Sequence, residues 1–386
     1  MQAVGFFFGQ GSGTYISRQL GAHETENASR MAISGVVLSA IAGAVITILG
    51  LVFLTPLAHF LGSTDTILPY AKDYLRIILL GAPYMLASFT LNNQLRFQGS
   101  AKYAMYGILA GAVINVGLDP LLIFTFRMGI AGAAWATILG QLISFCLLVF
   151  GTTRGGNLRL RLSHLQINGH ILHEIWRGGF PSLCRQGLLS VSTICLNTAA
   201  RAFGDVAIAA MSVVSRSMMM ANSAVIGFGQ GFQPVIGFNC GAGLIGRIKK
   251  GFRFCVLWGT IFLICAGVVG LIFAPQIIAI FRDDPAVVAF GAKALRLQCC
   301  TLFVSATVMT SNMLTQCLGE TGRATLLALS RQGLFLIPAV FLLPPFLDEL
   351  GLQLAQPIAD ILSLTITIII MRGVWRDLTS AETRST

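Results

Sequence analysis

Residues 9–22 read GQGSGTYISRQLGA, and residues 229–242 read GQGFQPVIGFNCGA. The two segments share residues at a constant separation of 220 positions: Gly9/Gly229, Gln10/Gln230, Gly11/Gly231, Ile16/Ile236, Gly21/Gly241 and Ala22/Ala242. The same separation aligns Leu75-Arg76 with Leu295-Arg296, Asn92 with Asn312, and Gly99 with Gly319. Because apolar composition alone does not maintain one separation over such a distance, the sequence predicts two repeated halves.

A later match extends the repeat with a small slip. MGIAGA at 128–133 aligns with LGLQLA at 350–355, at a separation of 222. The predicted crossings between segments 9–22 and 229–242 are even in number, which returns the chain to the same side of a membrane. We therefore expect two parallel, pseudo-symmetric halves around a central cleft. Residues 180–228 find no partner in the first half, so we expect that half to be N-terminally truncated, without its first helix and part of its second.

The composition assigns the chain to a bilayer. Of 386 residues, 55% are hydrophobic and 11% are charged, with a mean hydropathy of +0.78. A soluble domain averages about 25% charged residues, so we expect an all-α polytopic membrane protein. The net charge of +11 comes from basic residues between apolar runs, which is typical of membrane-protein loops and does not indicate a nucleic-acid partner. The nine cysteines lack metal-ligand spacing, so we expect neither a metal nor a cofactor.

Charge-poor windows long enough to cross the hydrocarbon core, which takes about 20 residues, predict the membrane helices. They lie near 31–55, 75–95, 103–126, 129–152, 175–201, 206–236, 254–281, 290–316, 324–346 and 350–372, after a partial apolar piece at 1–17. A census of the Lys and Arg residues places most of them, Arg331 included, on one side, which we assign to the cytoplasm. The predicted domains are an N-terminal lobe at 1–152, a cytoplasmic linker at 153–174, a six-helix C-terminal lobe at 175–376 and a tail at 377–386.

Asp119 is the clearest ionisable residue within a predicted span. It lies in VINVGLDPLLIF, one helical turn after Asn115 and directly before Pro120. Proline frees a backbone carbonyl one turn earlier, so a carboxylate, an amide and a carbonyl oxygen occur together. Such oxygen ligands suit a sodium ion, and the carboxylate alone suits a proton. A hydrated acid near the outer interface fits the same residues equally well.

Other polar residues in the spans have plainer interpretations beside the functional ones. Asp360 follows Pro357 and is either half of an ion site or the partner of Arg331 on the neighbouring helix; we favour the pair. Arg185 and Gln186 follow Pro181 and either face the cleft or lie at a cytoplasmic helix end. Asn197 and the other intramembrane asparagines can join helices by hydrogen bonds. GQGSG at 9–13 lacks the strand and the Lys-Ser/Thr of a phosphate-binding loop, so we interpret its small residues as a helix-packing surface.

A set of motifs in fixed order resembles one known family. They are GQGSGTYISRQLGA, NNQLRFQGSAKYAM, NVGLDP, GIAGAAWAT, PSLCRQGLLS, the NTAARAFGD run and AQPIADIL. Together, from residue 9 to about 375, they resemble the multidrug and toxic compound extrusion (MATE) family, nearest to the sodium- or proton-coupled bacterial drug exporters. The resemblance implies twelve helices in two lobes, a V-shaped cavity, and export of cationic amphipathic compounds by rocking of the lobes.

The resemblance also implies a cation site. The family uses an Asn, an Asp one turn later and a Thr on the next helix, which match Asn115, Asp119 and Thr137. A further family Asp lies on the first helix, which has no counterpart in this sequence. The acidic pair that another branch uses in its second lobe has no counterpart at 182–204 or 297–316.

The leading hypothesis is therefore a monomeric secondary antiporter of the bacterial plasma membrane, not an enzyme. It would export small organic cations in exchange for Na⁺ or H⁺, with Arg185, Gln186, Asn197 and Asp360 in the substrate cavity. One alternative is a lipid-linked oligosaccharide flippase of related fold, which would need several basic residues in the cleft. The other is a non-transporting truncated fragment.

Overall fold

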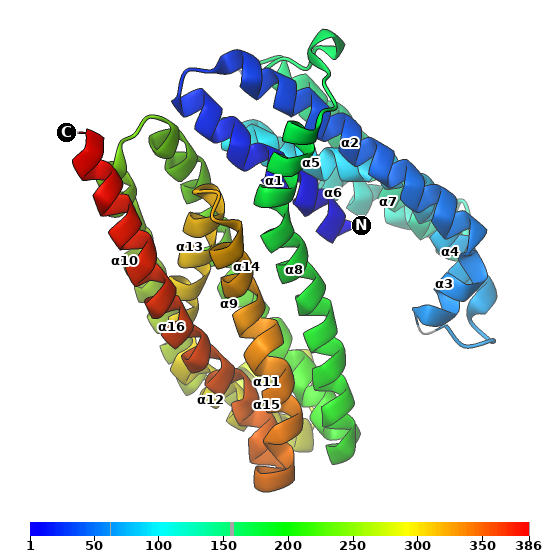
Figure 1. Ribbon diagram of the computed structural model, residues 1–386. Coiled ribbons are helices and arrows are strands. Elements are labelled where there is room, and N and C mark those ends of the chain that lie inside the picture. Colours follow the sequence, from blue (N-terminus) through cyan, green and yellow to red (C-terminus); the bar gives the residue numbers. More distant parts are fainter. Residues whose placement is uncertain (62, 155–157, 386) are drawn as a thin grey trace. The chain divides into compact units, whose positions relative to one another are not determined.

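The chain forms helices grouped into two compact units (Figure 1). A computed structural model describes residues 1–61, 63–154 and 158–385, with side chains up to residue 380, and contains no strand in those ranges. Unit 1 is Met1–Leu183 and unit 2 is Cys184–Thr386. The boundary falls within one helix, beyond the linker predicted at 153–174. Residues 155–157 of that linker and residue 386 of the predicted tail lie outside the described residues.

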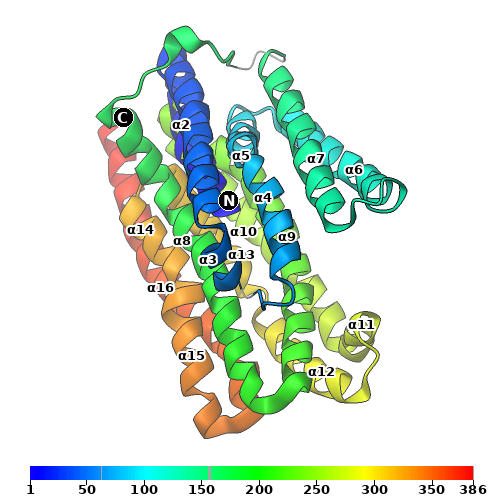
Figure 2. The same ribbon diagram turned by 90° about the vertical axis from the view of Figure 1, so that its right-hand side faces the viewer.

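Unit 1 is built mainly from long helices joined by short turns. They are α1 (Gln2–Gly21), α2 (Thr25–Val52), α3 (Leu54–Phe60), α4 (Leu68–Leu80), α5 (Ala82–Phe97), α6 (Ala101–Pro120), the π-helix η1 (Leu121–Thr125), α7 (Gly129–Thr152), the short 3₁₀ turn η2 (Leu162–His164) and the first part of α8 (Gly169–Ala200). The stretch GQGSG lies inside α1, which fits a helix-packing surface and does not fit a phosphate-binding loop. Helices α6 and α7 run side by side (Figure 2).

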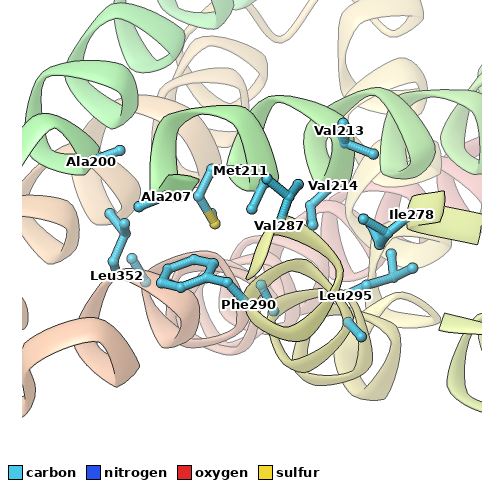
Figure 3. Close-up of a cluster of buried hydrophobic side chains, with 14 of the residues drawn as sticks. Ala200, Ala207, Met211, Val213, Val214, Ile278, Val287, Phe290, Leu295 and Leu352 are labelled. Carbon is cyan, nitrogen blue, oxygen red and sulfur yellow. The ribbon is translucent and has the colours of Figure 1, made fainter. Parts of the chain in front are cut away.

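Unit 2 continues α8 and adds a second set of helices. They are η3 (Arg201–Phe203), α9 (Gly204–Gly241), α10 (Ile245–Ile272), α11 (Ala274–Phe281), α12 (Pro285–Thr301), α13 (Val304–Cys317), α14 (Thr321–Leu329), the π-helix η4 (Ser330–Leu336), α15 (Ile337–Leu342) and α16 (Pro344–Ser385). A buried apolar cluster joins α9, α11, α12 and α16. In it, Met211 points from α9 toward the ring of Phe290 on α12 (Figure 3).

The described helices account for the predicted spans, with two corrections of shape. Seven helical stretches are long and apolar enough to cross a membrane, and two bent helix pairs raise the total to nine. One of the seven, Gly169–Gly241, contains the predicted spans 175–201 and 206–236, which Gly204 separates by a turn at φ +88°. The single spans predicted at 75–95 and 290–316 are each a pair of helices, bent by 54° and 56°. On α6, Val113 and Val116 are 69% and 70% exposed, as lipid-facing side chains would be.

The predicted repeat recurs in the helix bounds and contacts. Thr25–Val52 and Ile245–Ile272, the bounds of α2 and α10, lie 220 residues apart at both ends. The helices α5 and α13 both end before a glycine of positive φ, Gly99 and Gly319. The Asn92 side chain donates to the Ala104 carbonyl oxygen at 2.8 Å, and the Asn312 side chain donates to the Ala324 carbonyl oxygen at 2.7 Å. The same sequence separation therefore gives the same backbone path and the same helix-to-helix hydrogen bond.

A groove of glycines on α1 receives side chains from α5. A Cβ atom on Gly5 would lie 2.7 Å from Phe89, and one on Gly9 would lie 2.7 Å from Asn93. A Cβ atom on Gly13 would overlap the ring of Phe97, which is buried. The four-residue spacing on both helices places ridge into groove. Small residues permit this approach, and in a bilayer such packing replaces the hydrophobic drive between helices.

Gly13→Ala is expected to destabilise unit 1. The added methyl group must displace the Phe97 ring, and overpacking of this kind costs about 1–3 kcal/mol. Gly117→Ala on α6 is the matched control, because nothing lies within 4 Å of its Cβ position. The apparent melting temperature of the purified protein in detergent measures both. Equal melting temperatures for the two variants would contradict the close packing of α1 against α5.

Candidate functional site

Three helices of unit 1 enclose a cavity of about 270 Å³. Its lining comes from α5 (Ser88, Phe89 and Asn92), α6 (Ile108, Gly111, Ala112 and Asn115) and α7 (Thr137, Gln141 and Ser144). Neutral polar side chains supply the oxygen and nitrogen atoms of this lining, and no charged side chain belongs to it. We call it the unit 1 pocket.

Backbone contact between α6 and α7 brings the polar side chains together. A Cβ atom on Gly111 would lie 2.9 Å from the Gly140 carbonyl oxygen, and one on Gly140 would lie 2.8 Å from the Gly111 carbonyl oxygen. Only glycine allows this approach without a shift of the helices. Asn115 follows Gly111 by one turn and Thr137 precedes Gly140 by about one turn, so both side chains project beside the contact.

The pocket contains hydrogen-bonding atoms that have no partner within the protein. The Asn115 Nδ2 atom is buried and has no hydrogen-bond partner. The Thr137 hydroxyl donates to the Ala133 carbonyl oxygen at 2.9 Å, which leaves the lone pairs of its oxygen free to accept. A buried amide without a partner costs about 1–3 kcal/mol, so such a group indicates a site for water or a ligand. Amide and hydroxyl oxygens suit hard monovalent or divalent cations.

Asp119 lies on the next turn of α6 and is not part of the lining. It is partly exposed and directly precedes Pro120, after which the helix continues as the π-helix η1. The structure thus brings together two of the three predicted cation ligands, Asn115 and Thr137. A role for Asp119 in ion binding stays a prediction.

Four pocket residues were missed by the sequence reasoning or given another role. Ser88, Gln141 and Ser144 were not singled out, and Asn92 was interpreted only as a link between helices. Asn92 does link α5 to α6 through Ala104, and it also lines the pocket. The signal was present in the sequence: Ser88 and Asn92 lie four residues apart on one face of α5, and Thr137, Gln141 and Ser144 lie four and then three residues apart on one face of α7.

The residues predicted for a substrate cavity lie in unit 2 and do not form one cluster. Arg185 donates from Nη1 to the Asn312 side-chain oxygen at 3.2 Å. Gln186 follows Arg185 on α8 and is half-buried, as is Asn197. Asn197 lies twelve residues after Arg185 on the same helix, about 18 Å along its axis. One polar group of a small ligand would therefore not reach both Arg185 and Asn197.

Asp360 pairs with Arg331, which is the interpretation the sequence favoured. The Arg331 Nε atom lies 2.7 Å from Asp360 Oδ1, and Gln356 donates to the same oxygen at 2.9 Å. Arg331, which the sequence counted with the cytoplasmic side, lies in η4, within the helical stretch 321–342, with its side chain 14% exposed. Basic residues inside a span are hard to tell from loop residues when only the local charge density is counted.

Comparison with known proteins gives one consistent result. The family model MatE matches residues 1–121 and 181–342. The multidrug export protein MepA of Staphylococcus saprophyticus is 27% identical over 377 residues, which cover 96% of this chain and 82% of that protein. MepA of Staphylococcus aureus is 26% identical over 373 residues, with 96% and 82% coverage.

Solved structures share the fold. A MATE protein crystallised in complex with MaL6 has a TM-score of 0.92 at 22% identity, covering 99% of this chain and 86% of its own. A MOP superfamily transporter from Pyrococcus furiosus, described as having a binding pocket of reversed polarity, has a TM-score of 0.90 at 23% identity, with 98% and 85% coverage.

Asn115→Leu is expected to remove a cation response of unit 1. If the pocket binds the coupling ion, sodium at fixed pH stabilises the unaltered protein by about 2.7 kcal/mol at 100 times the dissociation constant, and its melting temperature rises. Asn115→Leu keeps the volume but removes the ligand amide, so that rise should be lost. Asn197→Leu in unit 2 is the control and should keep it. The same ion response in both variants would exclude the pocket as the ion site.

Proposed function

Because the chain belongs to the MatE family, whose match covers most of both units, we propose that it is a secondary antiporter that exports organic cations in exchange for sodium ions or protons. One observation carries the coupling proposal. The unit 1 pocket gathers the amide and hydroxyl oxygens of Asn115, Thr137 and Gln141 inside an apolar helix bundle. Polar groups inside a membrane span are costly, and they are by default sites of function.

The proposed ion site combines the pocket with the neighbouring acid. Asn115, Thr137 and Asn92 present amide and hydroxyl oxygens, and Asp119 one turn away supplies negative charge. A sodium ion would take oxygens from this set, and a proton would go to the carboxylate. Asp119 is partly exposed, so an ion can reach its carboxylate from outside the packed helices.

Coupling then follows from differential binding. A ligand shifts a conformational equilibrium only by as much as its affinities for the two states differ. The ion at the unit 1 pocket and the organic cation must therefore favour opposite openings of the transporter. Moving an equilibrium from 1:99 to 99:1 takes about 5.5 kcal/mol of differential affinity, which a cation entering a dehydrated site can supply.

The proposed substrates are small amphipathic organic cations. The relatives named multidrug export proteins support this class. Asp360, which was predicted for the substrate cavity, already bonds to Arg331 and Gln356, so it is not available as a simple counter-charge. We propose a monomer in the bacterial plasma membrane, since the relatives with these names are staphylococcal.

Asp119→Asn is expected to abolish gradient-driven export of a cationic dye from everted vesicles. The amide keeps the size and hydrogen bonding of the side chain but removes the charge, so export should fall to the background of vesicles without the protein while expression is unchanged. Asp73→Asn is the matched control, because Asp73 is an exposed acid on α4 of the same unit and should leave export unaltered. Export by Asp119→Asn near the unaltered level would remove this residue from the coupling mechanism.

A further inference from the structure

In the part of unit 2 whose side chains are described, one acid is buried and is paired with a basic residue. Among the acidic side chains described in unit 2, only Asp360 is buried, at 3% exposure. Its Oδ1 atom accepts from the Arg331 Nε atom at 2.7 Å and from the Gln356 side chain at 2.9 Å. Beside Arg331 on η4, the Gln332 side chain accepts a hydrogen bond from Ser192 of α8 at 2.9 Å. Polar contacts therefore join η4 to α16 at Arg331 and to α8 at the next residue, Gln332.

The repeat relates Arg331 to a wall of the unit 1 pocket. Helices α6 and α14 begin 220 residues apart, at Ala101 and Thr321, and both receive the asparagine hydrogen bond from the preceding helix. Counting the same separation along them places Arg331 at the position of Gly111. Gly111 lines the unit 1 pocket.

Asp360 corresponds to the facing wall of that pocket. A Cβ atom on Gly132 would lie 2.9 Å from the backbone of Leu122, and one on Gly351 would lie 2.5 Å from the backbone of Leu343. These matching contacts align α7 with α16 at a sequence offset of 219 residues. The offset of 222 predicted from the sequence was wrong. The corrected register superimposes buried residues of like kind: Gly132/Gly351, Ala136/Ala355 and Ser144/Ser363.

The corrected register gives the two walls different chemistry in the two units. Thr137 and Gln141 line the unit 1 pocket, and their counterparts are Gln356 and Asp360. Gly111 and Ala112 correspond to Arg331 and Gln332. In unit 1 this position is a cavity lined by neutral groups, and in unit 2 it holds a guanidinium bound to a carboxylate.

We infer that Arg331 is a tethered cation, which fills in unit 2 the position where unit 1 presents its pocket to a mobile cation. Asp360 is then a cation-binding carboxylate. When the arginine is removed, it should bind a free guanidinium or another small monovalent cation. Removal of one partner from a buried pair leaves an uncompensated charge, which strongly favours binding of a replacement. This inference goes beyond the proposed export function, and only its comparison with a mobile ion in unit 1 rests on that proposal.

Arg331→Ala tests the inference by chemical rescue, with ethylguanidinium as the probe because it replaces the atoms that the substitution removes. The variant should melt about 5 °C or more below the unaltered protein, since a buried charge loses its partner. Ethylguanidinium at ~10 mM should restore at least half of that loss with saturation, because ligand binding to the folded state raises its stability. Ethylurea, which has similar shape and no charge, should restore none of it.

Two further variants make the rescue specific. Arg331→Ala combined with Asp360→Ala lacks the carboxylate, so it should not respond to ethylguanidinium and should melt above the single variant. Arg323→Ala is the matched control, because Arg323 pairs with Glu320 at 3.0 Å and Asp377 at 2.8 Å in a more exposed setting. Such pairs contribute little, so this variant should not respond either. An equal ethylguanidinium response in all three variants would overturn the inference.

The mirror experiment covers the case in which Arg331→Ala does not fold. Asp360→Ala leaves the guanidinium unpaired, and formate, which replaces the lost carboxylate, should raise its melting temperature while chloride at equal ionic strength should not. If neither ethylguanidinium nor formate rescues its variant, the inference about Arg331 is wrong. It is also wrong if the double variant fails to fold as both single variants do. These measurements use no ion gradient and no drug, so their failure leaves the export proposal intact, and loss of export in Asp119→Asn says nothing about Arg331.

Discussion

The contact of α6 with α7 at Gly111 and Gly140 is the constraint on which the proposed site depends. Carbonyl oxygens of each helix lie where a Cβ atom of the other would be, so the two helices touch backbone to backbone. Between α1 and α5, Gly5, Gly9 and Gly13 instead make room for side chains of α5. In a bilayer, lipid tails are as apolar as leucine, and close packing of small residues takes over the role that hydrophobic burial has in water. Polar side chains beside these contacts are then held away from lipid and can serve a ligand.

The two units share one backbone arrangement but differ in buried charge at corresponding positions. The asparagine that bonds from α5 to α6 in unit 1 recurs from α13 to α14 in unit 2 with nearly the same length. Around that shared frame, glycine is exchanged for Arg331 and glutamine for Asp360. A repeat whose halves differ at a buried charge can assign a moving ion to one half and a fixed ion to the other. The π-helix η4 lies at this difference, and π-segments frequently occur at functional sites.

The sequence predicted the helices and the repeat well because both depend on patterns of apolar residues and on a few shared glycines and asparagines. It did not predict the bends of the α4–α5 and α12–α13 pairs, since the windows at 77–95 and 297–319 contain no charged residue to mark a break. The register of α7 against α16 was wrong by three residues for a related reason: glycines and alanines in apolar runs match at several offsets. The resemblance gave Asn115 and Thr137 a common site, but the cavity beside them, with Asn92 and Gln141, depends on packing between helices that local spacing does not determine.

The most direct test of the account is the response of transport to membrane potential in reconstituted vesicles. If one monovalent cation exchanges for one monovalent organic cation, each cycle moves no net charge across the membrane. A potential set with valinomycin and potassium, in the absence of any sodium or proton gradient, should then drive no accumulation of a cationic dye, whereas an ion gradient at zero potential should. Each elementary charge moved is worth about 2.3 kcal/mol per 100 mV, so an electrogenic cycle would be unmistakable. Dye accumulation that follows the potential alone would contradict the exchange of a single mobile ion.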